Sequence, residues 1–90
     1  MPATYTVLSS GALSPPTISI PTGYTVELTF IDKGSARVHA IVHTPKPVDI
    51  VAPPGGDSYL LVSHLPKGTY AIDINGVARG SLVIGAAPGP

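Results

Sequence analysis

Apolar and polar residues alternate along much of this chain in short runs, and no stretch shows the spacing of an amphipathic helix. The clearest run spans Thr25–Ile31. Within it, Val26, Leu28 and Phe30 fall on one face of an extended strand, and the residues between them fall on the other. Several short runs of this kind, divided by turn residues, are typical of a β-sandwich or β-barrel.

About eight runs are expected to form strands, because Gly, Pro and other turn residues separate them at regular intervals. Asn75-Gly76 is a strong hairpin signal, since both positions tolerate a positive φ. The segment Gly68-Thr69-Tyr70 predicts a tyrosine corner, in which the Tyr hydroxyl bonds to backbone a few residues upstream. The expected strands are Thr4–Leu8, Thr17–Ile20, Thr25–Ile31, Arg37–His43, a short edge strand Val48–Val51, Asp57–Ser63, a strand that places Tyr70, Ile72 and Ile74 on one face, and Val77–Ile84.

The composition bounds the domain and excludes several classes of function. A chain of 90 residues predicts a single domain over residues 1–85, followed by a flexible tail over residues 86–90. Charged residues make up 11% of the chain and the net charge is zero, so neither nucleic acid nor an anionic membrane surface is an expected partner. No stretch is long and apolar enough to predict insertion into a membrane. The absence of cysteine excludes disulfides, zinc-thiolate sites and cysteine catalysis.

Three segments resemble the cupredoxins, a family of small copper-binding β-proteins. The segment Ile18–Phe30 resembles the family's two apolar strands joined by a Pro-x-Gly turn. The polar turn that leads from Phe30 toward His39 resembles the approach to the first copper ligand, and Val51–Ile84 resembles the remaining loop, Gly-x-Tyr segment and closing strand. The resemblance implies an all-β Greek-key sandwich or barrel of seven or eight mostly antiparallel strands.

Within that family, the likeness is closest to domains of exported actinobacterial proteins related to the iron-uptake EfeO components. The resemblance therefore implies an extracytoplasmic protein, secreted or lipid-anchored, whose leader peptide is absent from this chain. It also implies where the chain departs from copper-binding members: Ile74 stands where the ligand Cys would be, and Ala78 where the ligand Met would be. Because a blue-copper centre needs a thiolate, we expect no such centre in this protein.

The three histidines, His39, His43 and His64, are the candidate metal ligands, since imidazole suits both copper(II) and zinc. On one strand, His39 and His43 would lie about 13 Å apart, too far to share one ion unless the strand bends. The alternative is that His39 caps the end of the barrel and that the other two are surface residues. The pattern leaves open whether Val38 and its alternate neighbours or His39 and its alternate neighbours face inward.

Nothing in the sequence indicates catalysis. No Gly-x-Ser-x-Gly motif occurs, and no pair of carboxylates has recognisable acid–base spacing. Asp32 and Asp57 are expected in turns, where Asp side chains bond to nearby backbone N–H groups. We therefore expect a non-enzymatic accessory or interaction domain with a protein partner, an exposed apolar patch or open sheet edge, and weak homodimer formation. The alternative is a His-only domain that binds copper(II) or zinc.

Overall fold

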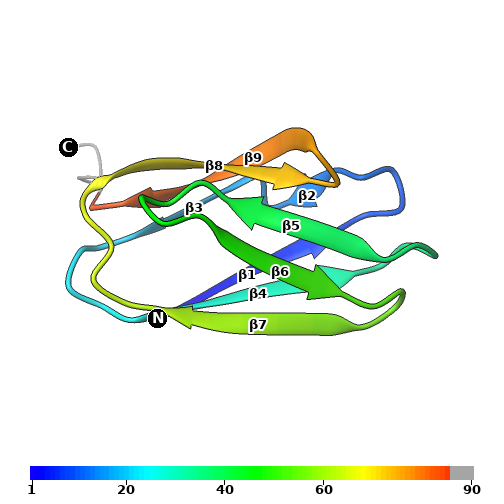
Figure 1. Cartoon of the computed structure of the whole chain (residues 1–90), viewed down its shortest axis with the longest axis horizontal. Helices are drawn as coiled ribbons and strands as arrows, with labels where there is room; N and C mark the ends of the chain where they lie inside the picture. The colour runs from blue at the N-terminus through cyan, green and yellow to red at the C-terminus, as the bar shows by residue number, and fades with distance from the viewer. Residues whose placement is uncertain (86–90) are drawn as a thin grey trace.

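A computed structural model describes residues 1–85 and places them in nine β-strands (Figure 1). Within these residues, none of the chain forms a helix that is long and apolar enough to cross a membrane. The predicted tail over residues 86–90 lies outside the described residues. The strands are β1 (Pro2–Val7), β2 (Leu13–Ser14), β3 (Thr17–Ile20), β4 (Val26–Asp32), β5 (Val38–Val42), β6 (Val48–Ala52), β7 (Asp57–Val62), β8 (Gly68–Ile74) and β9 (Val77–Ile84).

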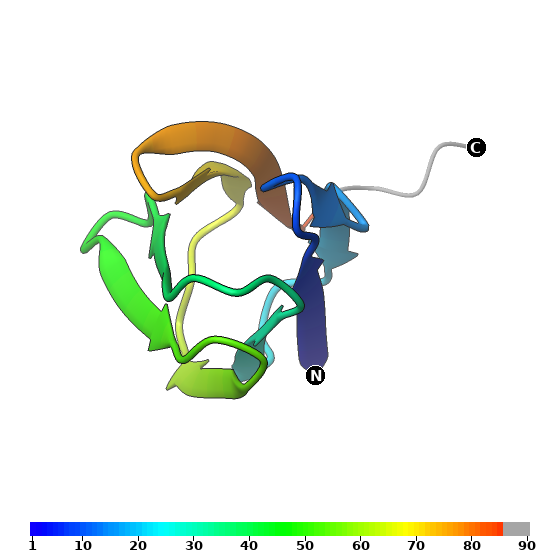
Figure 2. The same ribbon diagram turned by 90° about the vertical axis from the view of Figure 1, so that its right-hand side faces the viewer.

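The strands form two sheets that face one another, with orders β2-β1-β4-β7 and β3-β9-β8-β5-β6 (Figure 2). Most neighbours are antiparallel, but β1 pairs parallel with β4 and β3 pairs parallel with β9. The prediction of an all-β sandwich of mostly antiparallel strands is confirmed. The expected number of strands was too low, because the two-residue strand β2 has no alternation that a sequence pattern could reveal.

Alternate residues of the strands build one core between the sheets. The predicted inward face of β4 is confirmed, since Val26, Leu28 and Phe30 are almost completely buried. The Phe30 ring stacks on the Tyr5 ring of β1, with 5.3 Å between ring centroids. The Tyr5 hydroxyl donates a hydrogen bond to the Ser81 carbonyl of β9 at 2.7 Å, and this bond joins the two sheets.

The turn predictions are also confirmed. Asn75 and Gly76 both have positive φ, 51° and 85°, and connect β8 to β9 in a tight hairpin. The Tyr70 hydroxyl donates to the Pro66 carbonyl, four residues upstream, as a tyrosine corner requires. Together these local features fix the path of the chain through its last two strands.

The structure decides which face of β5 points inward. Val38, Ala40 and Val42 are buried, whereas His39 is exposed. The inward set is therefore the wholly apolar one, as expected from the cost of burying an unpaired polar side chain. His39 therefore faces outward.

Candidate functional site

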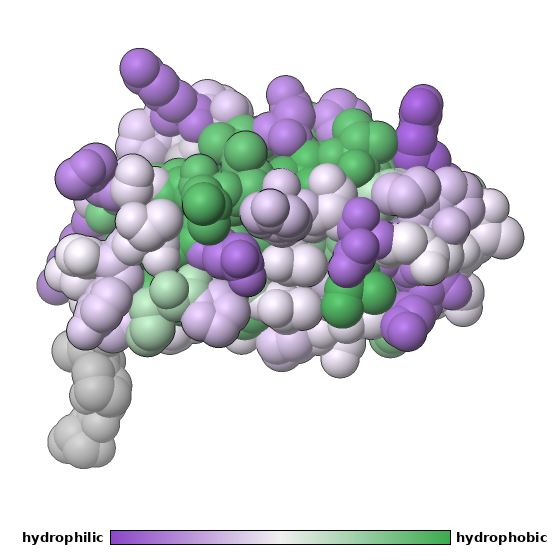
Figure 3. All heavy atoms as spheres, turned by 90° about the horizontal axis from the view of Figure 1, so that it is seen from below, coloured by the Kyte–Doolittle hydropathy of each residue, from purple (hydrophilic) through white to green (hydrophobic). Residues whose placement is uncertain are grey.

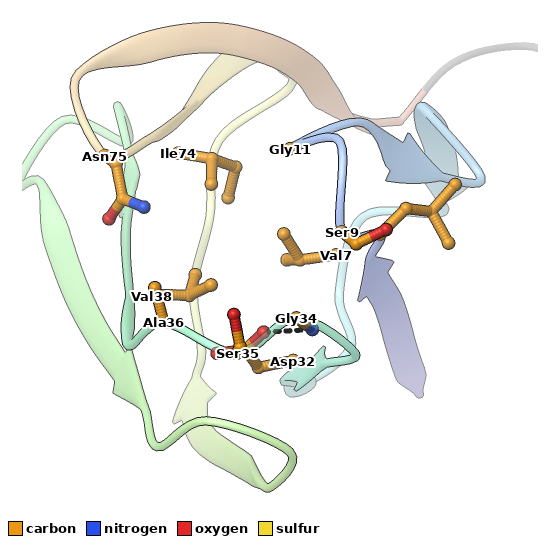
Figure 4. A pocket seen from close by; sticks show the side chains of 11 residues that line it. Val7, Ser9, Gly11, Asp32, Gly34, Ser35, Ala36, Val38, Ile74 and Asn75 are labelled. Atoms are coloured by element: carbon orange, nitrogen blue, oxygen red, sulfur yellow. Dashed lines mark hydrogen bonds between the residues drawn. The ribbon is translucent and has the colours of Figure 1, made fainter.

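A small cavity of about 150 Å³ lies at the end of the sandwich where β1, β4 and β8 end and β5 begins (Figure 4). Val7, Val38 and Ile74 point into it from three strands. Asp32, the last residue of β4, lies on the opposite side from Ile74. The lining residues are Val7, Leu8, Ser9, Gly11, Asp32, Gly34, Ser35, Ala36, Val38, Ile74 and Asn75.

Asp32 is the one carboxylate buried in the described part of the chain, with 1% of its surface exposed. Its Oδ1 accepts a hydrogen bond from the Gly34 backbone N–H at 2.8 Å, which confirms the predicted turn role. Its Oδ2 is closed off from solvent and has no hydrogen-bond partner among residues 1–85. The cavity therefore offers an incoming ligand little accessible charge, and its lining mixes apolar side chains with polar ones such as Ser9, Ser35 and Asn75.

The residues around this cavity do not fit a blue-copper centre. His39, which the resemblance places near the first copper-ligand position, faces away from the cavity, and Val38 lines the cavity instead. Ile74 occupies the position expected for the ligand Cys, and the whole chain contains no cysteine to supply a thiolate. Within the described residues, no three His, Cys, Asp or Glu side chains come together as a metal site would require.

The structure separates the candidate ligands His39 and His43. His39 Nε2 lies 3.1 Å from Asp49 Oδ1 of β6, on the outer face of the sheet. His43 follows the opposite end of β5, and its Nε2 lies 2.9 Å from Asp73 Oδ2 of β8. Each imidazole therefore has its own carboxylate partner on a different neighbouring strand.

The third candidate, His64, lies in the loop between β7 and β8 and has a positive φ of 60°. This loop borders a second, larger cavity of about 460 Å³ at the other end of the sandwich. Thr44, which directly follows His43, lines the same cavity, so His43 and His64 lie toward one end and His39 toward the other. Metal binding by these three histidines stays a prediction.

A different surface stands out at the edge of the four-stranded sheet. In β7, Tyr59 and Leu61 are 65% and 60% exposed on the outer face, opposite Thr29 and Glu27 of β4. Leu60 faces the other way and is still 38% exposed, because no strand covers that side of β7 in its sheet within residues 1–85. Figure 3 views the molecule from the side of β7 and shows hydrophobic side chains gathered there between hydrophilic ones.

The backbone of β7 also has unused hydrogen-bonding groups along this edge. The Asp32 N–H donates to the Gly56 carbonyl at 2.8 Å, directly beside the first residue pair of β4 and β7. In an antiparallel ladder the bonded pairs alternate, so the even-numbered residues of β7 bond to β4. The odd-numbered residues direct their N–H and C=O groups to the free edge, and these are Asp57, Tyr59 and Leu61.

Natural sheets usually protect such an edge with Lys, Pro or a bulge. Like the edge strand β6 of the other sheet, β7 contains no Pro, Lys or Arg, and its one charged residue is Asp57 at its start. This strand was predicted over Asp57–Ser63, close to its observed bounds, but it was not predicted to form a binding surface. The available signal was the unbroken apolar run Tyr59–Val62, which puts apolar side chains on both faces of a strand.

Comparisons with known proteins bear on the fold alone. No protein-family model and no curated protein sequence matches the chain. Among solved structures, auracyanin B aligns with a TM-score of 0.77 at 12% identity over 97% of this chain and 88% of that chain. The purple cupredoxin from Nitrosopumilus maritimus aligns at 0.65 with 16% identity over 91% of this chain and 98% of that one. Auracyanin from Roseiflexus castenholzii aligns at 0.67 with 16% identity over 97% of both chains. The predicted cupredoxin-like fold is confirmed.

Proposed function

We propose that this chain is a non-enzymatic, extracytoplasmic interaction domain of cupredoxin-like fold, without a blue-copper centre, and that it binds protein through the free edge of β7. One observation carries the proposal: β7 combines three exposed apolar side chains with a row of free backbone groups. The exposed side chains are Tyr59, Leu60 and Leu61.

These features match recognition by strand addition. An extended segment of a partner pairs with an open sheet edge, and main-chain hydrogen bonds supply much of the affinity. The free N–H and C=O groups of Tyr59 and Leu61 would form those bonds. The same two side chains lie on the outer face of the sheet, where they would pack against alternate residues of the added strand.

The other parts of the proposal rest on the sequence and on the resemblance to cupredoxins. Among the structures of similar fold, one is named a purple cupredoxin and another a copper binding protein. This chain contains no cysteine, Ile74 stands where the resemblance places the ligand Cys, and His39 faces away from the cavity. We infer that the scaffold is kept and that its surface, not a metal, performs the function. The proposed extracytoplasmic location rests on the resemblance of the sequence to exported EfeO-related domains.

A peptide titration tests the proposal. The probe is a capped six-residue peptide of alternating Thr and Val, which matches the length of β7. We expect saturable ¹H–¹⁵N shift changes in Asp57–Val62 and in the adjacent strand β4, because the peptide extends that sheet. A twin peptide that carries an N-methyl group on every residue lacks the donors of both edges and should bind much more weakly.

Two variants complete this test. Leu61→Lys replaces an exposed apolar side chain at the proposed surface, and Val77→Lys makes the same change at a half-exposed position on β9. Weaker peptide binding is expected for Leu61→Lys alone. Equal binding by both peptides, or shift changes confined to other strands, would rule out β7 as the binding edge.

A further inference from the structure

The geometry points to a second copy of this chain as a partner of the β7 edge, paired antiparallel about a two-fold axis that passes through Leu60. This inference rests on the proposed function and names its partner. Most closed homodimers have a two-fold axis, which requires the same strand to be complementary to itself. Whether β7 meets that requirement follows from its backbone alternation and its side chains.

The two-fold axis restricts the register. In an antiparallel pair, residues directly opposite one another point to the same face of the sheet. When a strand pairs with its own copy, each residue must therefore lie opposite itself or opposite a residue an even number of places away. Three registers centred on β7 satisfy this condition, with the axis at Tyr59, Leu60 or Leu61.

The register centred on Leu60 fits the side chains and backbone best. Tyr59 lies opposite Leu61 of the second copy, and both have backbone groups directed to the free edge, so each such pair can exchange two hydrogen bonds. Leu60 lies opposite its own copy on the inner face, at the closer, non-hydrogen-bonded spacing. The register centred on Tyr59 instead places Asp57 opposite Leu61, and the one centred on Leu61 shortens the pairing within β7.

Charge and size indicate a weak dimer. The net charge is zero, so two copies do not repel one another through an overall charge. The strand supplies six residues to the contact, whereas stable interfaces have about 20–30 residues on each side. The dissociation constant of the dimer is therefore expected to be high-micromolar or larger, with continuous exchange between monomer and dimer.

Disulfide trapping tests the register directly. The chain has no cysteine, so a second copy is the one protein partner with which a single introduced thiol can form a disulfide. Oxidised glutathione first forms a mixed disulfide with one thiol, and the thiol of the second copy then displaces the glutathione. In Leu60→Cys the two Cα atoms would lie about 4.5 Å apart across the axis, within the range of a disulfide. Val51→Cys is the matched control, because Val51 is a similarly exposed residue on the edge strand β6. Leu60→Cys should cross-link about tenfold faster or more under oxidised glutathione, since pairing raises the effective thiol concentration.

The comparison has an internal reference. In urea, where no sheet edge exists, both variants should cross-link at equal rates. A native-like ¹H–¹⁵N spectrum of the reduced Leu60→Cys variant establishes that it folds. Equal rates for the folded variants would overturn the β7 dimer, even if the chain associates through another strand.

Sedimentation equilibrium of the unmodified chain gives a second measurement that does not depend on that variant. We expect reversible self-association, and about tenfold weaker association in Leu61→Lys, because that change replaces the side chain opposite Tyr59. A chain that stays monomeric at millimolar concentration would overturn the inference. If the Thr-Val peptide still binds β7 in that case, the proposed function stands without the dimer; if the peptide also fails to bind, both are wrong.

Discussion

Replacement of Tyr5 by Phe should lower the stability of the fold at neutral pH and remove part of its sensitivity to alkali. Tyr5 is fully buried and stacks on Phe30, and its hydroxyl donates to the Ser81 carbonyl across the two sheets. Tyr5→Phe keeps the stacked ring but removes the donor, which leaves the carbonyl without this partner. The expected loss in the free energy of unfolding is about 1 kcal/mol.

The larger effect appears at alkaline pH. Burial raises the pKa of Tyr5 from 10.0 to about 12, although an interaction with the Ile18 backbone opposes part of this rise. In the unfolded chain the phenol ionises near its ordinary pKa, at a lower pH than in the folded protein. As the pH increases, this ionisation therefore stabilises the unfolded state relative to the folded state. The contribution of Tyr5 is thus fully present below pH 10 and is lost between pH 10 and about 12. The rise in pKa corresponds to an upper limit of about 2.7 kcal/mol.

Urea unfolding followed by circular dichroism over this pH range measures the effect. The unmodified protein and Tyr5→Phe should both lose stability as other groups titrate, but the unmodified protein should lose up to about 2.7 kcal/mol more. Ultraviolet titration should show one late-ionising phenol that disappears in the variant. Parallel stability curves for the two proteins would refute this account of Tyr5.

Three further changes test other parts of the structure. Tyr70→Phe removes the bond to the Pro66 carbonyl and should lower the free energy of unfolding in urea by about 1–2 kcal/mol; an unchanged value would contradict the role of the corner. Gly80→Ala would place a Cβ 2.2 Å from the Pro16 carbonyl oxygen and should lower the free energy of unfolding by about 2–3 kcal/mol in the same assay. An unchanged value would show that β3 moves away from β9 at no cost in stability. Zinc titration should give diffuse, non-saturating shift changes that His39→Ala does not alter, since His39 and His43 each pair with a different carboxylate; a saturable response lost in that variant would favour the metal-binding alternative.

Local chemistry explains why much of the fold could be predicted from the sequence. The hairpin at Asn75-Gly76 depends on two residues that accept a positive φ, and β9 was placed at its observed bounds. Strands such as β4 alternate because one face is buried and the other is not, so their inward residues follow from the pattern. The tyrosine corner at Tyr70 is likewise a short-range motif.

The features that remained unpredicted depend on contacts between distant segments. The parallel pairing of β1 with β4 and of β3 with β9 has no local sequence signal. The sequence pattern allowed either face of β5 to point inward. In the structure, Val38 faces the core and His39 faces outward. β7 is exposed because it is the edge strand of its sheet. The alternation of residues within a strand does not reveal whether that strand lies at an edge.

Residue-specific amide hydrogen exchange along β7 tests the central claim most directly. In the dilute monomer, the N–H groups of Tyr59 and Leu61 should exchange rapidly, whereas that of Leu60 should be protected by its bond to β4. Addition of the Thr-Val peptide should slow exchange at Tyr59 and Leu61 and leave the protection of Leu60 little changed. Uniform protection along β7 before the peptide is added, or no change after it, would contradict the claim that this edge is free to bind a strand.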